Sequence, residues 1–257
     1  MAELKYEVVD VNDKNLEEYG LFCQKSRCKE EGYKNKVKWF KEQHKKGLRV
    51  RLLGYRNDKG RFVLVGFVEY VPGEYSWRGV DAKGWMVIHC MWVIGKHKRQ
   101  GLGSKLLEEC VKDAKGMNGI VVVTSKKHWL PNEKLFVKNG FVKVDEMPSF
   151  ELYAKKLKDN VALPQFNPIS QKKLDSYGKG LTILESHQCP YSCKIVETIK
   201  KIAERAKIQV KVEHLSGCQE AQKNGVHPYG TFCVILNGKV VSYYPGDTKE
   251  VRQALKQ

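Results

Sequence analysis

The sequence has 257 residues, 42% of them hydrophobic, which is enough to bury one large core or two modest ones. No apolar run approaches the roughly 18 residues of a membrane span, and the start has no apolar signal region. We therefore expect a cytoplasmic protein with no membrane segment.

The net charge of +17 is spread along the chain, with +12 over residues 1–178 and +5 over residues 179–257. Because no nucleic-acid-binding motif accompanies it, we expect small anionic ligands and no nucleic-acid partner.

The first part of the chain alternates between helical and strand patterns. A helical apolar stripe follows a glycine-containing loop and consists of Leu102, Leu106, Leu107, Cys110, Val111 and Ala114. In chain order we predict helices at 16–28 and 33–46, strands at 49–55, 62–70 and 85–93, a helix at 102–116, a buried strand at 120–123, a helix at 133–138, and strands at 141–144 and 150–157. This order predicts an α/β (α+β) fold with a mixed sheet.

Residues 159–178 interrupt this pattern with prolines, asparagines and a glycine, as in a linker or crossing segment. We therefore expect a first domain at 1–158 and a smaller α/β domain at 179–257. In chain order the second domain is predicted to contain a strand at 181–184, a helix at 190–206 with Ile195, Ile199, Ile202 and Ala206 on one side, a strand at 208–213, a hairpin of 232–236 and 240–244 around Asn237-Gly238, and a last helix with Asp247 as N-cap and Glu250 as its capping-box partner.

A strand runs into a basic, glycine-containing turn that opens a helix, in the sequence Met91-Trp92-Val93-Ile94-Gly95-Lys96-His97-Lys98-Arg99-Gln100-Gly101-Leu102-Gly103-Ser104. Such a turn directs free backbone N–H groups and the positive end of a helix toward one point, and glycines let an anion approach the main chain. A pyrophosphate is the ligand that this pattern favours. The loop lacks the third glycine of a dinucleotide-binding fold and the final Gly-Lys-Ser/Thr of a P-loop.

Residues 1–157 resemble the GNAT superfamily of acetyl-CoA-dependent N-acetyltransferases. The family signature L-x-V-x-P-x-x-R-x-x-G-x-G is matched by Met91, Val93, Gly95, Lys98, Gly101 and Gly103, with Gly95 in place of proline and Lys98 in place of arginine or glutamine. A second landmark, L-Y-x-x-x-G-F, appears as residues 135–141 with Phe136 in place of the tyrosine. The resemblance implies a GNAT-type mixed sheet, acetyl-CoA as cosubstrate and a small-molecule amine as acceptor.

The resemblance also implies which residues bind the coenzyme. The amides of Arg99, Gln100, Gly101, Leu102, Gly103 and Ser104 would bind the pyrophosphate, beside the positive charge of Lys98. Main-chain groups of Met91, Trp92 and Val93 would hold the pantetheine arm, on a strand that separates from its neighbour, and would polarise the thioester carbonyl.

Acetyl transfer also needs a base for the amine and an acid for the departing thiolate. His89 lies two residues before Met91, where serotonin N-acetyltransferases of the same superfamily place a histidine, and it is the first candidate base. Glu69 on the neighbouring strand is the second. The tyrosine that usually supplies the acid is replaced by Phe136, so another group or water must protonate the thiolate, or the activity is weak, altered or absent. Cys90 should face away from His89 because side chains alternate along a strand.

Two aromatic segments border the predicted acceptor side. The loop 70–84 contains Tyr75, Trp77 and Arg78, and a second segment runs His128-Trp129-Leu130-Pro131. They are candidates for a substrate pocket, with ordinary anchoring of loops by aromatic residues as the alternative.

The second domain begins with a cysteine motif between a strand and a helix. Cys189-Pro190-Tyr191-Ser192-Cys193 resembles the active-site corner of thioredoxin-like domains, and Cys-Pro-Tyr is similar to glutaredoxins. A thiolate at a helix N-terminus is stabilised by the helix dipole. The spacing is C-x-x-x-C rather than C-x-x-C, and Gly230-Thr231 replaces the proline-threonine of the thioredoxin pattern, so general disulfide exchange is disfavoured. The combination of an N-terminal GNAT domain with a thioredoxin-like second domain resembles the YoaP-like acetyltransferases.

These observations lead to two hypotheses. The first is an acetyl-CoA-dependent N-acetyltransferase in which the thiol-containing second domain assists substrate recognition. The second is a coenzyme A-binding thiol or metal sensor with little transferase activity. Without a C-x2-C pair of zinc-ligand type, no metal site is assigned, and Cys189 and Cys193 remain open as redox partners, metal ligands or neither. Oligomeric state is also open, a homodimer included.

Overall fold

The computed structural model describes residues 4–125, 130–224 and 226–256. The chain divides into two compact units, each assembled from three stretches of sequence. Unit 1 comprises Met1–Lys25, Lys41–Ser76 and Asp81–Phe166, and unit 2 comprises Ser26–Phe40, Trp77–Val80 and Asn167–Gln257. Within the described ranges, no helix combines the length and the apolar content that crossing a membrane requires.

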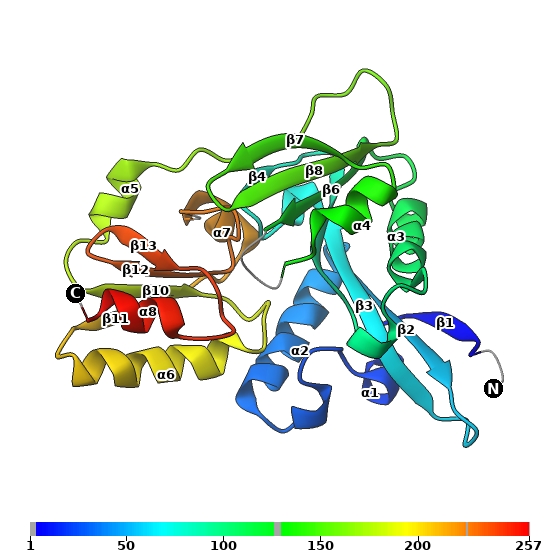
Figure 1. Ribbon diagram of the computed structural model, residues 1–257, viewed down its shortest axis with the longest axis horizontal. Coiled ribbons are helices and arrows are strands. Elements are labelled where there is room, and N and C mark those ends of the chain that lie inside the picture. Colours follow the sequence, from blue (N-terminus) through cyan, green and yellow to red (C-terminus); the bar gives the residue numbers. More distant parts are fainter. Residues whose placement is uncertain (1–3, 126–129, 225, 257) are drawn as a thin grey trace. The chain divides into compact units, whose positions relative to one another are not determined.

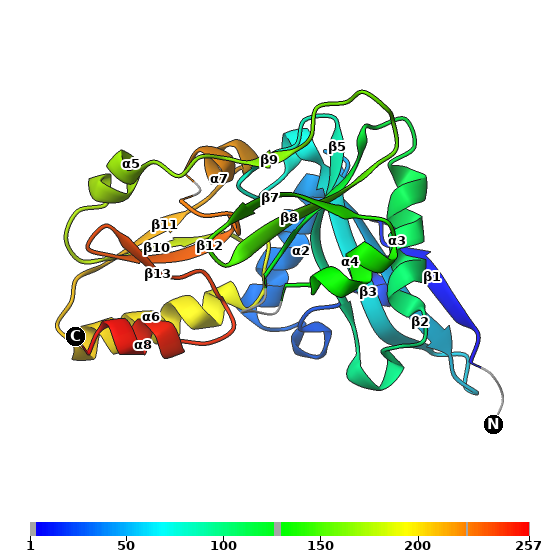
Figure 2. The ribbon, with the colours of Figure 1, turned by 45° about the horizontal axis from the view of Figure 1, so that its top comes forward.

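Unit 1 is built on a seven-stranded mixed sheet (Figures 1 and 2) with the spatial order β1-β2-β3-β5-β6-β8-β7. The strands are β1 (Tyr6–Asp10), β2 (Arg49–Arg56), β3 (Phe62–Pro72), β5 (Trp85–Val93), β6 (Gly119–Thr124), β7 (Val142–Met147) and β8 (Phe150–Lys156). Strands β5 and β6 are parallel, and the other neighbours are antiparallel. The predicted mixed sheet is confirmed, and β5 has the predicted bounds.

Helix α3 (Leu102–Asp113) packs against the sheet and forms much of the core of unit 1. Five of the six residues in the predicted apolar stripe are buried, and Val111 is partly buried against the same cluster. Full burial of a large apolar side chain contributes about 1.5–3 kcal/mol, so this stripe fixes the helix on the sheet. The position of the first turn of α3, which follows the glycine loop, is therefore set by the core.

The single helix predicted over residues 16–28 is wrong. Helix α1 (Leu16–Tyr19) ends at Gly20, whose φ of 64° lies in the left-handed region, and a 3₁₀ turn η1 (Lys25–Arg27) follows before α2 (Glu31–His44). Helix α4 (Glu133–Lys138) has the predicted bounds and is capped by the side chain of Asn132. The remaining short elements are η2 (Gly73–Tyr75), β4 (Val80–Asp81), η3 (Gly95–His97), β9 (Gln165–Phe166) and α5 (Gln171–Ser176).

Unit 2 contains a four-stranded sheet with the order β11-β10-β12-β13. Strand β10 is parallel to β11 and antiparallel to β12, which forms an antiparallel hairpin with β13. Figures 1 and 2 show α6 and α8 beside one face of this sheet and α7 toward the other. The elements are β10 (Leu181–Glu185), α6 (Ser192–Arg205), β11 (Val210–His214), α7 (Cys218–Asn224), β12 (Phe232–Leu236), β13 (Lys239–Ser242) and α8 (Lys249–Ala254).

The predicted hairpin at Asn237-Gly238 is confirmed, and both residues have positive φ, as a two-residue turn of type I′ requires.

Two details of the helices in unit 2 differ from expectation. The buried side of α6 runs through Val196, Ile199 and Ala203, whereas Ala206 is exposed because it caps a helix that ends at Arg205. Helix α8 is capped at Thr248 rather than Asp247, whose carboxylate instead accepts a hydrogen bond from the Lys249 amide.

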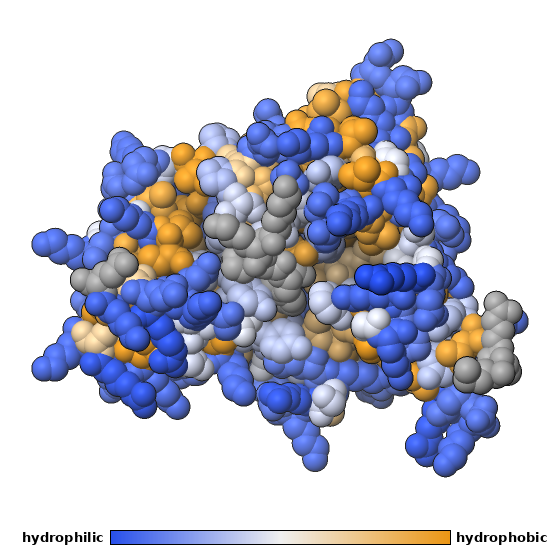
Figure 3. Space-filling view, viewed as in Figure 1, coloured by the Kyte–Doolittle hydropathy of each residue, from blue (hydrophilic) through white to orange (hydrophobic). Residues whose placement is uncertain are grey.

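The positive charge is distributed over solvated surfaces, and hydrophilic residues cover much of the face in Figure 3. Several lysines pair with a glutamate one helical turn or a few residues away, as Lys112 does with Glu109 at 2.6 Å and Lys200 with Glu197 at 2.8 Å. Exposed pairs of this kind contribute little, about 0–1 kcal/mol. The charge is thus a general property of the surface.

Arg78 and His227 belong to the polar interior of unit 2. The guanidinium of Arg78 donates hydrogen bonds to the Tyr229 carbonyl at 2.6 Å and to the Thr231 hydroxyl at 3.2 Å, and it lies 4.4 Å from the centre of the Tyr229 ring. Burial, aided by the positive charge of Arg78, lowers the pKa of His227 to about 3. The neutral imidazole accepts a hydrogen bond from the Tyr229 amide. The interior therefore holds the Arg78 cation by hydrogen bonds and keeps His227 neutral.

This histidine should make the protein sensitive to mild acid. An imidazole in the unfolded chain titrates near pH 6.5, so between about pH 6.5 and 3 the unfolded state binds the additional proton and stability falls as the pH is lowered. From pH 6.5 to 5 the expected loss is about 2 kcal/mol. In urea unfolding at both pH values, His227→Gln should lose less stability on acidification than the wild type. An equal loss in the two proteins would contradict the assignment.

Candidate active site

A cleft of about 850 Å³ opens beside the end of β5 and the start of α3. Its described lining comes from β5, the glycine loop, α3 and the region of α4. The lining residues are Met91, Trp92, Val93, His97, Lys98, Arg99, Gly101, Leu102, Gly103, Ser104, Leu130, Pro131, Asn132, Lys134, Leu135 and Lys138. Nine of the ten residues expected around a coenzyme therefore line one cavity. The tenth, Gln100, instead bonds to the Lys96 carbonyl and to the Tyr6 hydroxyl.

The backbone of the glycine loop leaves the first amides of α3 available. Gly101 is the N-cap and has φ 76°, a left-handed conformation, and it has no side chain that could accept from those amides. A Cβ at Gly101 would meet nothing within 4 Å, so the glycine is needed here for its conformation. Gly103 has a different role, because a Cβ there would lie 3.0 Å from the Leu135 side chain. It permits close packing between α3 and α4.

The cleft is electropositive. Its described lining includes four lysine or arginine side chains, at positions 98, 99, 134 and 138, and no aspartate or glutamate. The Lys98 ammonium lies 4.4 Å from the centre of the Trp92 ring, and 41% of Trp92 is exposed. Together with the positive end of the α3 dipole, these charges make the mouth of the cleft a site for an anionic group.

Strand β5 separates from β6 beside the cleft. Their parallel pairing, as far as the structure describes it, covers Trp85–Ile88 opposite residues 119–122. Strand β5 continues for five further residues, and the last three of them line the cleft. An extended ligand at this position therefore meets strand backbone on one wall.

The two candidate bases lie in contact but away from this cleft. The His89 Nδ1 atom is 3.5 Å from the Glu69 Oε1 atom, and both side chains are fully or almost fully buried. The other ring nitrogen of His89 lies 3.5 Å from the Ser76 hydroxyl. Neither His89 nor Glu69 belongs to the described lining of the cleft. The pair is thus a buried polar contact between β5 and β3.

Comparisons with known proteins identify the family of the chain. Residues 14–141 match the model of the acetyltransferase (GNAT) family. The chain is 31% identical over 242 residues to the uncharacterized N-acetyltransferase YoaP of Bacillus subtilis strain 168, covering 91% of this chain and 92% of that protein. The chain belongs to the GNAT acetyltransferase family.

Solved acetyltransferase structures show partial similarity to the chain. One is the PaiA N-acetyltransferase of Thermoplasma acidophilum in complex with coenzyme A, with 19% identity, a TM-score of 0.41, and coverage of 60% of this chain and 99% of that one. Another is yncA of Salmonella typhimurium, solved with acetyl-CoA, with 17% identity, a TM-score of 0.44, and coverage of 62% and 98%.

Within this GNAT chain, the position expected for a tyrosine acid is apolar. Phe136 is fully buried and packs edge-on against Phe141, with ring centres 5.3 Å apart. It belongs to the hydrophobic core that also holds α3. A phenyl ring donates no proton, so this side chain cannot protonate a departing thiolate.

His97 was missed by sequence reasoning, although it lies inside the predicted loop. It lines the cleft, only 5% of it is exposed, and its Nδ1 atom is 2.9 Å from the Tyr6 hydroxyl. Burial and the charge of Lys96 lower the pKa of His97. In the sequence, His97 stands between Lys96 and Lys98 and resembles part of a solvated basic segment. Its contact with Tyr6 on β1 arises only in the folded chain, so no signal in the sequence pointed to it.

The two aromatic segments have different positions in the structure. In the loop 70–84, Tyr75 is exposed, whereas Trp77 and Arg78 are buried within unit 2. His128 and Trp129 lie outside the described residues, while Leu130 and Pro131 line the cleft. The second segment therefore contributes to the cleft, at least through these two residues.

The cysteine corner lies in unit 2 between β10 and α6. Cys189 is 5% exposed, and its carbonyl accepts from the Ser192 amide. Cys193 is half-buried, and burial followed by the charge of Glu31 raises its pKa. No disulfide joins the two cysteines in this structure. Neither the burial of Cys189 nor the raised pKa of Cys193 favours a reactive thiolate.

Proposed function

We propose that this protein is an acetyl-CoA-dependent N-acetyltransferase that acts on the amine of a small acceptor. The observation that carries the proposal is the electropositive cleft at the N-terminus of α3, in a chain of the GNAT family. A helix N-terminus with uncapped amides and four surrounding cations suits a pyrophosphate. Beside it, the part of β5 that extends beyond its pairing with β6 offers backbone groups to an amide-containing arm.

In this proposal each part of the cleft has a separate task. The amides of residues 99–104, with Lys98 nearby, bind the pyrophosphate of the coenzyme. Main-chain groups of Met91, Trp92 and Val93 hold the pantetheine arm and stabilise the negative charge that develops on the thioester oxygen. Because hydrogen bonds to a developing oxyanion strengthen in the transition state, they accelerate the transfer itself.

The chemical step is attack of a neutral amine on the thioester carbonyl, followed by departure of the coenzyme A thiolate. We assign proton acceptance to His89, with the Glu69 carboxylate at 3.5 Å stabilising the imidazolium. The burial of this pair implies that the amine proton reaches it through an intervening water or hydroxyl group. With Phe136 in place of a tyrosine, solvent protonates the leaving thiolate.

For the second part of the chain we propose a thioredoxin-like domain at 179–257, following a GNAT domain at 1–158 and a connecting segment at 159–178. The β-α-β order with β10 parallel to β11, followed by an antiparallel hairpin and a final helix, supports this interpretation. The domain would assist recognition of the acceptor. The burial of Cys189 argues against a general disulfide oxidoreductase.

A second candidate function is a coenzyme A-binding sensor of thiols or metals with little transferase activity. The apolar Phe136 favours it, because the usual acid is absent from its position. The buried His89–Glu69 pair favours the transferase, because an imidazole beside a carboxylate is a ready proton acceptor.

Substitution of Gly101 tests the coenzyme site. Gly101→Val forces a β-branched residue into a left-handed conformation and should weaken acetyl-CoA binding by at least about tenfold, or 1.4 kcal/mol, in calorimetry. Gly116→Val is the matched control, because Gly116 has φ 91°, equally open surroundings and a position just beyond the other end of α3. Equal affinities in the two variants would remove the loop from the coenzyme site.

Substitution of His89 tests the proposed base. His89→Gln should lower kcat by about 10²–10⁴-fold and remove the limb of the pH–rate profile that reports the proton acceptor, while acetyl-CoA affinity stays unchanged. The control is His44→Gln, since His44 is a histidine on α2 to which we assign no role in catalysis. A variant with wild-type kcat and an unchanged pH–rate profile would exclude His89 from proton transfer.

A further inference from the structure

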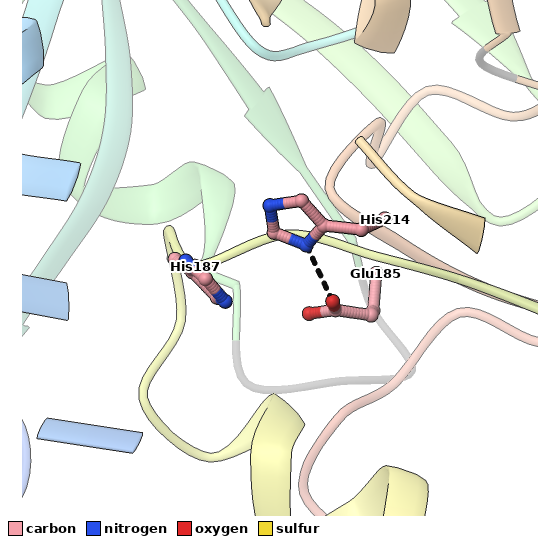
Figure 4. Close-up of side chains that lie close together, drawn as sticks. All are labelled: Glu185, His187 and His214. Atoms are coloured by element: carbon pink, nitrogen blue, oxygen red, sulfur yellow. Dashed lines mark hydrogen bonds and ion pairs between the residues drawn. The ribbon is translucent and has the colours of Figure 1, made fainter. Parts of the chain in front are cut away.

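A cluster of three potential metal ligands lies in unit 2 at the carboxyl ends of two parallel strands. Glu185 is the last residue of β10, His214 is the last residue of β11, and His187 follows β10 by two residues. One ligand atom from each of the three lies within 4.8 Å of the other two. Figure 4 shows the three side chains converging on one another.

The backbone that carries these side chains is held firmly. Glu185 and His214 are register partners in the parallel ladder, and the Leu215 amide donates to the Glu185 carbonyl at 2.8 Å. His187 is held between two buried neighbours. The Ser186 hydroxyl donates to the Thr231 carbonyl at 3.1 Å and accepts from the Gln188 amide at 3.4 Å. The strand register thus sets Glu185 and His214 side by side, and the hydrogen bonds of Ser186 hold the loop that carries His187.

An ion pair joins two of the three members. The His214 Nδ1 atom lies 2.5 Å from the Glu185 Oε1 atom, as expected for a carboxylate beside an imidazole. The third member, His187, has its ring centre 4.2 Å from that of His214, with the planes tilted by 46°. Two imidazoles and one carboxylate that converge on a single point are what a metal centre requires.

We propose that Glu185, His187 and His214 form a binding site for a divalent transition-metal ion, with Zn²⁺ as the expected occupant. Imidazole nitrogens favour zinc and its neighbours, whereas magnesium and calcium take mainly oxygen ligands. Tetrahedral Zn²⁺ with bonds of about 2.0–2.1 Å places its ligand atoms about 3.3 Å apart, which small side-chain rotations from the present spacing achieve.

The site is accessible to solvent. The side chain of His214 is 43% exposed and that of Glu185 is 14% exposed. Three protein ligands with an open position resemble the arrangement that lets a metal bind water or a small donor molecule. This site lies outside the proposed coenzyme cleft, so it does not depend on the transferase assignment.

The test uses the full-length protein without an affinity tag, stripped of metal with a chelator that is then removed. Zn²⁺ binding is measured by calorimetry, and Co²⁺ binding by visible absorption. The proposal predicts one equivalent of bound metal and a Co²⁺ spectrum without a thiolate-to-metal charge-transfer band. His187→Ala, His214→Ala and Glu185→Gln should each weaken binding by at least about tenfold.

Glu213→Gln is the matched control. This residue precedes His214 on β11, its carboxylate pairs with Lys211 at 2.7 Å, and strand alternation directs it to the opposite face. The control should bind like the wild type, and far-ultraviolet circular dichroism should confirm that all variants are folded. The proposal is overturned by absence of binding at millimolar Zn²⁺, by a thiolate band, by unchanged affinity in the three variants, or by equal loss in the control.

Discussion

The N-terminus of α3 depends on a conformation that only glycine adopts easily. At φ 76°, Gly101 turns the chain from the basic loop into the helix and leaves the first amides without a capping side chain. The apolar stripe of α3 is buried against the sheet, so the core fixes the direction in which these amides point. Four cations and no carboxylate in the described lining then make this end of the cleft specific for an anion. The proposed coenzyme binding follows from this combination.

The carboxyl ends of β10 and β11 have a comparable importance in unit 2. Parallel strands bring side chains that are distant in sequence to one edge of a sheet, and ligands commonly bind at such edges. Here that edge carries Glu185 and His214, while the loop after β10 carries His187 and leads to Cys189. The three ligand candidates converge at the strand ends, whereas the cysteines are more buried or have a raised pKa.

Local signals predicted much of the fold correctly. The stripe of α3, the bounds of β5 and α4, and the Asn237-Gly238 turn depend on periodicity and turn chemistry within a few residues. The glycine loop that lines the cleft was also visible in the local sequence, and its binding of the coenzyme stays a prediction. The break after Tyr19 was not foreseen, because a helical pattern continues past Gly20 although the backbone there turns left-handed.

Features that depend on strand register escaped prediction. His214 contacts Glu185 only because β10 and β11 pair in one particular register, and the residues are 29 apart in sequence. The contact of His97 with Tyr6 similarly joins a loop to a distant strand. Gly103 was expected to admit an anion, and its packing against Leu135 becomes visible only once α3 and α4 are placed.

The most direct test of the central claim is to titrate the reduced protein with acetyl-CoA and follow thioester cleavage with and without a panel of small amines. The proposed transferase predicts saturable binding, together with cleavage that rises with the concentration of at least one amine and yields the N-acetylated product. Binding with no amine-dependent cleavage would contradict catalysis and favour the sensor. Absence of binding would contradict the assignment of the cleft itself.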